Sequence, residues 1–269
     1  MKTFGKLLAI SIINPSFIGA LSETTSNQYL TGLLMAFLMT LLQAFVIYIL
    51  VTFHNGQSRK ALLWKTTLIF YGTTFLQANI EAVLFLKYMQ NTMSDTQINE
   101  MLIMGVVSSL IVAPVGVYLF WKEKPDGPRF SFPVKNNLLR GTGVAFLYMV
   151  IYTAFGALVF KPLAGDHFQA YYGDLQIPDW LLPFQILRGA LWAWLIWGTM
   201  HIVSGTRRQV VWYITAVMAI PITSLLLPIN EVMPGPIRTA HFVEVGGSML
   251  VFGFLAGRIF TRPLNKIKQ

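Results

Sequence analysis

The chain has 269 residues, of which 55% are apolar, 14% aromatic and only 12% charged, and it contains no cysteine. A soluble domain carries about 25% charged residues, so this composition excludes an ordinary soluble enzyme and a disordered polypeptide. The lack of cysteine excludes disulfides and thiolate ligands. The formal net charge of +9 raises the question of an acidic partner such as nucleic acid.

A short apolar run at 7–21 opens the chain, after Lys2 and Lys6. A basic start, a short apolar run and the small residues Gly19 and Ala20 resemble a secretory signal. The alternative is a retained short first helix, which Pro15 would kink. We favour the retained helix. The chain then has seven long spans plus this short first one, and with a cleaved signal it has the seven long spans alone.

Seven longer apolar runs follow, each of about 18–25 residues, the length that a helix needs to cross a hydrocarbon core of about 30 Å. They lie at 29–53, 66–88, 101–121, 141–160, 181–203, 209–228 and 239–257. These runs predict an all-α integral membrane protein, a polytopic helical bundle in which residues 1–269 form a single transmembrane domain.

The distribution of charge predicts the topology. Sixteen of the twenty basic residues lie near the two termini or in every second connector, whereas the other connectors hold only Lys87 and Lys161 and seven of the eleven acidic residues. This is the positive-inside pattern, which puts both termini in the cytoplasm of a multi-pass protein of a plasma membrane, most simply a bacterial inner membrane. A surface for nucleic acid would not avoid alternate loops, so we expect no nucleic-acid partner.

Tryptophans support the ends of the predicted spans. The four at span ends are Trp64, Trp121, Trp180 and Trp212. Tryptophan is enriched at membrane–water interfaces, so these positions are expected near the two surfaces of the bilayer.

A small set of ionisable residues lies inside or at the outer mouth of the predicted spans, where a buried charge costs about 2.5–3.5 kcal/mol on insertion scales and is a candidate for function. They are Glu81, Arg188, Arg238, His241 and Glu244. With the predicted topology, and at 1.5 Å per residue, all five lie within about 10 Å of the outer interface. Three spans therefore place their charges in the same leaflet.

The spacing of these residues favours a single cluster. Arg238, His241 and Glu244 are three residues apart and form a stripe on one helix. Gln77 lies four residues before Glu81, and Gln185 lies three before Arg188, on the same helix faces. We therefore predict one polar, ligand-binding cluster between the second, fifth and seventh long spans, at or near the outer surface.

Other chemistries have less support. His241 and Glu244 could both bind a metal, but two nearby arginines would repel a cation, so no metal is expected. His201 and His241 lie toward opposite ends of their spans and cannot hold one haem, and we expect no cofactor. The connectors are too short for a soluble catalytic domain, and no nucleotide-binding glycine motif is present.

The sequence thus predicts a permease-like or solute- or lipid-binding membrane protein, whose partners are the bilayer and an anionic small molecule or lipid headgroup. One alternative is a membrane-embedded enzyme with His241 and Glu244 as an acid–base pair. A second is a non-catalytic membrane scaffold in which the ion pairs only fix the bundle. The balance is against an enzyme, and the sequence leaves substrate and oligomeric state open.

Overall fold

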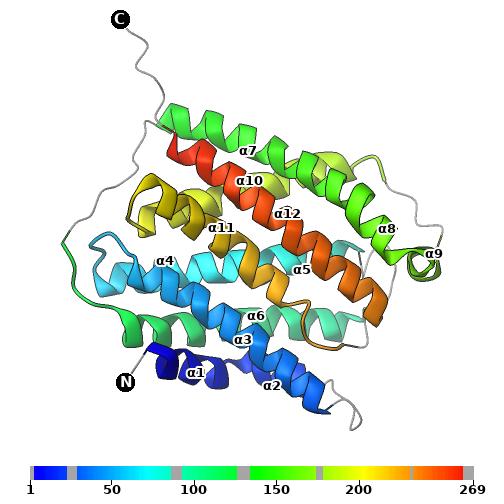
Figure 1. The fold of residues 1–269 in the computed structure, drawn as a ribbon, viewed down its shortest axis with the longest axis horizontal. Coiled ribbons are helices and arrows are strands. Elements are labelled where there is room, and N and C mark those ends of the chain that lie inside the picture. Colours follow the sequence, from blue (N-terminus) through cyan, green and yellow to red (C-terminus); the bar gives the residue numbers. More distant parts are fainter. Residues whose placement is uncertain are drawn as a thin grey trace, which may run out of the picture.

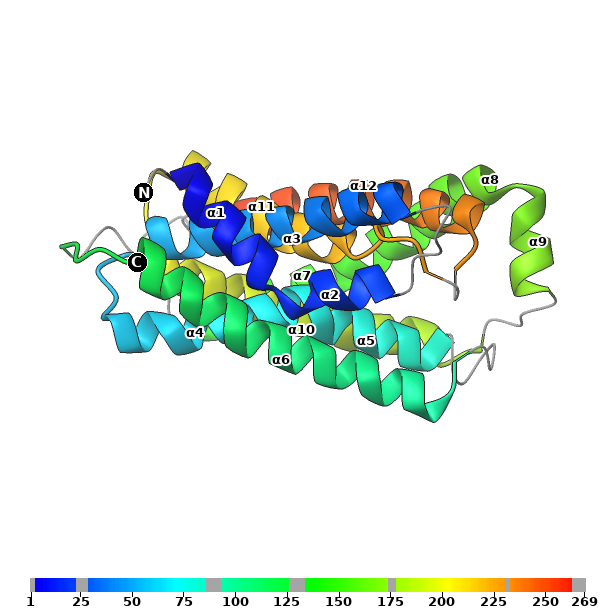
Figure 2. The same cartoon turned by 90° about the horizontal axis from the view of Figure 1, so that it is seen from below.

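The protein is a bundle of long helices, seen in Figures 1 and 2. This computed structural model describes residues 3–22, 29–85, 93–125, 134–173, 178–230 and 233–262. The first half of the chain forms α1 (Thr3–Ile13), α2 (Pro15–Ser22), α3 (Tyr29–Thr52), α4 (Arg59–Tyr71), the π-helical η2 (Gly72–Leu76), α5 (Gln77–Ala82) and α6 (Asp95–Phe120). The second half forms α7 (Val134–Phe155), the π-helical η4 (Gly156–Phe160), α8 (Lys161–Ala164), α9 (Asp166–Tyr172), α10 (Leu181–Ile202), α11 (Arg207–Ser224) and α12 (Gly235–Thr261).

Five helical stretches within the described residues are long and apolar enough to cross a membrane. They are Tyr29–Thr52, Arg59–Phe85, Asp95–Phe120, Asn136–Ala164 and Gly235–Thr261. The predicted span at 181–203 is helical as α10, and that at 209–228 is helical as α11 only as far as Ser224, because residues 225–228 form a turn. Gln185 and Arg188 reduce the apolar character of α10, and α11 begins with two arginines, so neither belongs to the five.

Several helices extend beyond the apolar runs that predicted them. The run at 66–88 belongs to a helix that already begins at Arg59, because the Ser58 side chain accepts a hydrogen bond from the Ala61 N–H and caps it. The run at 101–121 belongs to α6, which begins at Asp95 behind a capping box of Ser94 and Gln97. Apolar length thus marks the part of a helix suited to the bilayer, and capping residues mark its ends. Residues 86–88 lie outside the described residues.

The N-terminal apolar run forms two helices, and the break between them lies at Asn14, directly before Pro15, where the sequence predicted a kink. α1 ends at Ile13 and α2 begins at Pro15. The Asn14 side chain accepts a hydrogen bond from the Ser16 N–H at 3.1 Å and donates one to Gln43 Oε1 of α3 at 2.8 Å. These bonds satisfy polar groups that the break exposes inside the bundle, since Asn14 and Gln43 are fully buried.

The connectors rich in basic residues meet at one end of the bundle, which we call the basic end. His54 pairs with Val203 through a β-bridge, and its ring Nε2 lies 3.0 Å from the Lys122 carbonyl oxygen. At the same end Arg140 donates a hydrogen bond of 2.7 Å to the Phe260 carbonyl. α1 starts and α12 finishes on this side, whereas α9 lies at the opposite end (Figures 1 and 2). The alternation of charge along the sequence is therefore a separation of charge in space.

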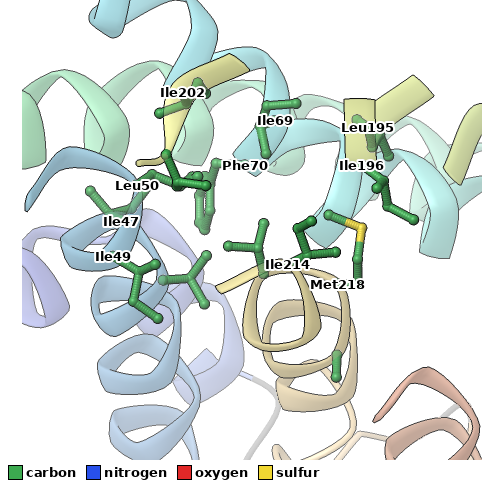
Figure 3. Packing of buried hydrophobic residues seen from close by; sticks show 14 of the residues in the cluster. Ile47, Ile49, Leu50, Ile69, Phe70, Leu195, Ile196, Ile202, Ile214 and Met218 are labelled. Carbon is green, nitrogen blue, oxygen red and sulfur yellow. The ribbon is translucent and has the colours of Figure 1, made fainter. Parts of the chain in front are cut away.

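The apolar core lies between helices from both halves of the chain. Figure 3 shows Ile47 and Leu50 of α3 facing Ile214 of α11, with Phe70 of α4 and Ile196 of α10 beside them. All five side chains are fully buried. This core holds α10 in the bundle, and α10 carries Arg188, the most deeply buried charged side chain among the described residues.

Glycines allow the closest helix contacts. A Cβ on Gly189 of α10 would lie 2.5 Å from the Ala145 carbonyl oxygen of α7, and one on Gly253 of α12 would lie 2.9 Å from the Thr215 Cα of α11. Backbones can approach this closely only where one helix lacks a side chain. The Gly189 contact is one residue from Arg188 and so fixes that residue against α7.

Candidate functional site

Arg188 is the centre of the candidate site. It lies on α10, its side chain is 1% exposed, and its Nη2 donates a hydrogen bond to Glu81 Oε2 at 2.9 Å. The same guanidinium group donates to the Gln77 backbone oxygen at 3.2 Å and to Gln185 Oε1 at 3.1 Å. A charge with this little contact with water is stable only when it is paired and its remaining donors are satisfied.

Two tyrosines of α7 cover the guanidinium group. Its Cζ lies 5.7 Å from the centre of the Tyr148 ring and 5.8 Å from that of Tyr152. These are cation–π distances. Tyr152 also donates a hydrogen bond to Glu81 Oε1 at 3.2 Å. Both oxygens of the Glu81 carboxylate are thereby held, one by Arg188 and one by Tyr152.

Two π-helical stretches lie next to residues of the candidate site. η2 ends at Leu76, so Gln77 is the first residue of α5, and η4 ends at Phe160. A π-helical turn inserts an extra residue and rotates all that follows around the helix axis, and such turns are frequent at functional sites. The rotation that brings Gln77 and Glu81 to face Arg188 follows such a turn.

A small pocket of about 20 Å³ lies beside the ion pair, which is room for about one water-sized group. Its polar walls are Glu81, Tyr148, Tyr152, Arg188, Glu244 and Ser248, and its other walls are apolar. The Glu244 side chain is 7% exposed. The pocket therefore holds two carboxylates and one guanidinium group, from three helices that the sequence analysis expected to meet.

A chain of hydrogen bonds runs from α9 to Glu244. The Tyr172 hydroxyl lies 2.9 Å from His241 Nε2, and His241 Nδ1 lies 3.2 Å from Glu244 Oε2. Burial, more than any nearby charge, raises the pKa of the Tyr172 hydroxyl, so this group keeps its proton and donates to Nε2. His241 then carries its hydrogen on Nδ1 and donates to Glu244. The Phe160 ring stacks on His241 with the ring centres 4.0 Å apart.

The structure brings six of the seven residues expected in the ligand-binding cluster into two connected groups. Arg188 contacts Glu81, Gln77 and Gln185 directly, and His241 contacts Glu244, which shares the pocket with Arg188.

Arg238, the seventh, lies apart from both groups. It is half-buried in the first turn of α12. Within the described part of the chain it makes no ion pair with Glu81 or Glu244. The stripe of three-residue steps begins in the first turn of α12, and Arg238 is not among the residues that line the pocket.

Two residues of the site could not be expected from the sequence. Tyr172 lies in the polar connector after the fourth long span, where the sequence gives no helical periodicity, and Phe160 is one of many aromatic residues at span ends. Tyr148 and Tyr152 carried a weak signal, since two tyrosines four residues apart share one helix face. Ser248, one turn after Glu244, was visible by the same spacing.

No group of three or more His, Asp or Glu side chains suited to a metal ion occurs in the described ranges. Comparison with known protein families, with characterised proteins and with solved structures finds no match to this chain. Its class therefore follows from its own residues: a helical bundle, with five stretches able to cross a membrane, around a buried Arg188–Glu81 ion pair and an acidic pocket.

Proposed function

We propose that this chain is a permease-like, solute-binding membrane protein whose binding site is the pocket between Glu81, Arg188 and Glu244. The observation that carries the proposal is the state of Glu244. Its carboxyl group is nearly buried, faces the pocket and accepts a hydrogen bond from the neutral His241 ring, while Arg188 is bound to Glu81. A buried carboxylate without a full counter-charge attracts a proton or another positively charged group.

The charge of the pocket favours a cationic solute. Glu81 and Arg188 cancel, so an ionised Glu244 leaves the pocket with one net negative charge. The anionic ligand expected from the sequence used Arg238 as a second cation of the cluster, and among the described residues Arg238 forms no ion pair with Glu81 or Glu244. We therefore propose a small amine or ammonium group as the ligand, with a proton as the competing occupant of Glu244.

The contacts of His241 argue against catalysis by the acid–base pair. Both ring nitrogens have partners, Tyr172 and Glu244, and one face of the ring lies against Phe160. A general base must reach the proton that it removes from a substrate, and no nitrogen of this ring is free to do so. The hydrogen-bonded chain from Tyr172 through His241 to Glu244 instead fits a role in controlling the charge of the Glu244 carboxyl group.

We propose the predicted topology along with the site: seven long spans and a short first helix, with the basic end in the cytoplasm of a bacterial plasma membrane. The gathering of basic residues at one end supports this orientation. The pocket then opens in the outer half of the bilayer, where a permease would meet a solute from outside.

A binding experiment tests the proposal. The protein, purified in detergent, is heated with ammonium, ethanolamine or choline chloride, with sodium chloride at the same ionic strength as the reference. Because the pocket has room for about one water-sized group, we expect ammonium to raise the unfolding temperature, choline not to raise it, and Glu244→Gln to abolish the rise with ammonium. Glu100→Gln is the matched control, since Glu100 is exposed near the start of α6, and it should keep the rise.

The scaffold alternative predicts a different result. In that case no cation stabilises the wild-type protein more than sodium does, and Glu244→Gln changes stability equally with and without the amines. The enzyme alternative, in which Glu244 takes part in proton transfer, predicts that Glu244→Gln abolishes turnover of a substrate while the protein stays folded.

A further inference from the structure

A second cavity lies at the basic end, far along the bundle from the pocket. It is an open groove of about 520 Å³ between α4 and α6, lined by Arg59, Lys60, Leu63, Pro114, Val117 and Tyr118. α4 begins at this end of the bundle and α6 finishes there, so the two helices run antiparallel along its sides (Figure 2).

The lining of the groove changes with depth. Arg59 and Lys60 are exposed in the first turn of α4, and Leu63 lies one turn further along. On α6, Pro114 lies one turn deeper than Tyr118. The groove thus has two cations at the membrane surface and an apolar floor about 6 Å below, at 1.5 Å per residue.

Two basic side chains, Arg59 and Lys60, line the groove. No ion pair of Arg59 or Lys60 occurs among the residues that the structure describes. The guanidinium carbon of Arg59 lies 5.0 Å from the centre of the Tyr118 ring, which holds the group over the groove. Arginine in this setting can donate two parallel hydrogen bonds to a phosphate.

Aromatic and apolar residues beside the groove indicate its level in the bilayer. Trp64, one turn after Lys60, is 56% exposed, and Leu68, one turn further, is 53% exposed. Tryptophan prefers the interface and leucine the hydrocarbon. The groove therefore spans the boundary between the headgroups and the acyl chains.

We propose that this groove is a binding site for an anionic phospholipid, with its phosphate on Arg59 and Lys60 and an acyl chain along Leu63, Pro114 and Val117. Basic pockets between membrane helices on the cytoplasmic side are suited to such headgroups. A zwitterionic lipid fits less well because its amine adds positive charge beside two cations. The site is independent of the pocket around Arg188.

Native mass spectrometry of the full chain in detergent tests the site, with phosphatidylglycerol and phosphatidylcholine of identical acyl chains. We expect phosphatidylglycerol to stay bound and phosphatidylcholine to dissociate. Two basic side chains near an anionic surface contribute about 1 kcal/mol each, so Arg59→Gln/Lys60→Gln should weaken the anionic lipid by about thirtyfold.

The matched control removes two charges from the same end, away from the groove. Arg208→Gln/Arg258→Gln changes exposed residues of α11 and α12 and should alter the affinity by no more than about threefold, the effect of a diffuse surface charge. The unfolding temperature of each variant without lipid verifies that it is folded. Equal losses in the two double variants would overturn the proposal.

Two further probes separate the parts of the ligand. Short-chain dihexanoyl phosphatidylglycerol should bind much more weakly than the long-chain lipid, because it leaves the apolar floor uncovered. Inorganic phosphate should not raise the unfolding temperature. Equal binding of phosphatidylcholine, of the short-chain lipid or of phosphate would each show that the groove is not a site for an anionic phospholipid.

Discussion

Arg188 and Glu81 form an ion pair whose two partners differ in their access to water. The nitrogen–oxygen distance is 2.9 Å, the Arg188 side chain is 1% exposed and the Glu81 side chain is 32% exposed. Water can therefore reach the carboxylate but not the guanidinium group. The consequence is that the two partners should not be equivalent when one of them is removed.

Removing the carboxylate should be the more damaging change. Glu81→Ala leaves a buried cation without its counter-charge, and we expect a loss of about 3 kcal/mol in the free energy of unfolding. Arg188→Met leaves a carboxylate that water can solvate, and should cost less, about 1–2 kcal/mol for the unsatisfied Gln185 and Gln77 acceptors. Denaturant unfolding in detergent measures both losses.

The double variant Glu81→Ala/Arg188→Met completes this test. Because the two side chains interact directly, the double variant should be more stable than the sum of the single losses predicts. Additive losses would contradict a coupled pair. They would mean that each side chain is held by its other neighbours.

The close contact of α10 with α7 should not tolerate a methyl group at Gly189. A Cβ there would lie 2.5 Å from the Ala145 carbonyl oxygen and 2.8 Å from its Cα, both parts of a backbone that cannot turn away. We expect Gly189→Ala to cost about 1–3 kcal/mol as an overpacked contact. Thermal unfolding in detergent provides the measurement.

Gly143→Ala on α7 is the control for this substitution, since nothing lies within 4 Å of a Cβ at that position. Alanine is a better helix former than glycine by up to about 1 kcal/mol, so this variant should be as stable as the wild type or more so. Equal destabilisation by the two variants would contradict the helix contact.

The buried amide pair of Asn14 and Gln43 should hold the broken N-terminal helix in the bundle. Asn14→Leu removes the 2.8 Å bond to Gln43 and the acceptor of the Ser16 N–H. Buried groups left without partners cost about 1–3 kcal/mol, so we expect a loss in that range in denaturant unfolding. Gln43→Leu should cost a similar amount.

The double variant Asn14→Leu/Gln43→Leu distinguishes a specific bond from general packing. Replacing both partners by apolar groups leaves fewer unsatisfied atoms than replacing one, so part of the loss should be regained. A double variant that loses as much as the two singles together would show that the amides do not act as a pair.

The sequence predicted which helices bring Glu81, Arg188 and Glu244 near one another, as the shared pocket shows, but not how each helix is rotated. Charge alternation assigned a direction to each span, and direction with residue number placed Glu81, Arg188 and Glu244 at one level. Apolar runs around these residues are nearly continuous, so they do not define a buried face. The rotation of Gln77 and Glu81 about the helix axis follows the π-helical turn at Gly72–Leu76, and a second such turn lies at Gly156–Phe160. The residue pattern predicts neither turn.

The apolar pattern also did not predict the contacts made by residues near helix ends and in connectors. Arg238 was assigned to the cluster because it shares a stripe with His241 and Glu244, but it lies in the first turn of α12, away from the pocket. Tyr172 was missed because α9 is short and polar and lies between longer spans. Contacts made by connectors depend on the tertiary structure and not on local periodicity.

The last prediction concerns pH and His54, in the connector between α3 and α4 at the basic end. Its Nε2 lies 3.0 Å from the Lys122 carbonyl oxygen, so it donates, and its Nδ1 accepts a hydrogen bond from the Gln57 N–H at 3.1 Å. One ring nitrogen that donates and one that accepts require the neutral imidazole. Burial, with a further contribution from the nearby Lys124, lowers the pKa of His54 below its ordinary value of 6.5.

The unfolded chain therefore binds this proton more tightly than the folded protein does. The contribution of His54 to the free energy of unfolding is fully present above about pH 6.5, the pKa of the unfolded chain. It falls as the pH drops below that value toward the lower pKa of the folded state. Thermal unfolding between pH 5 and pH 8 should show this loss, and His54→Gln should reduce the slope below pH 6.5. His201→Gln, a change at an exposed ring on α10, should keep the slope of the wild type. A wild-type slope in His54→Gln would mean that the pH dependence arises from other groups.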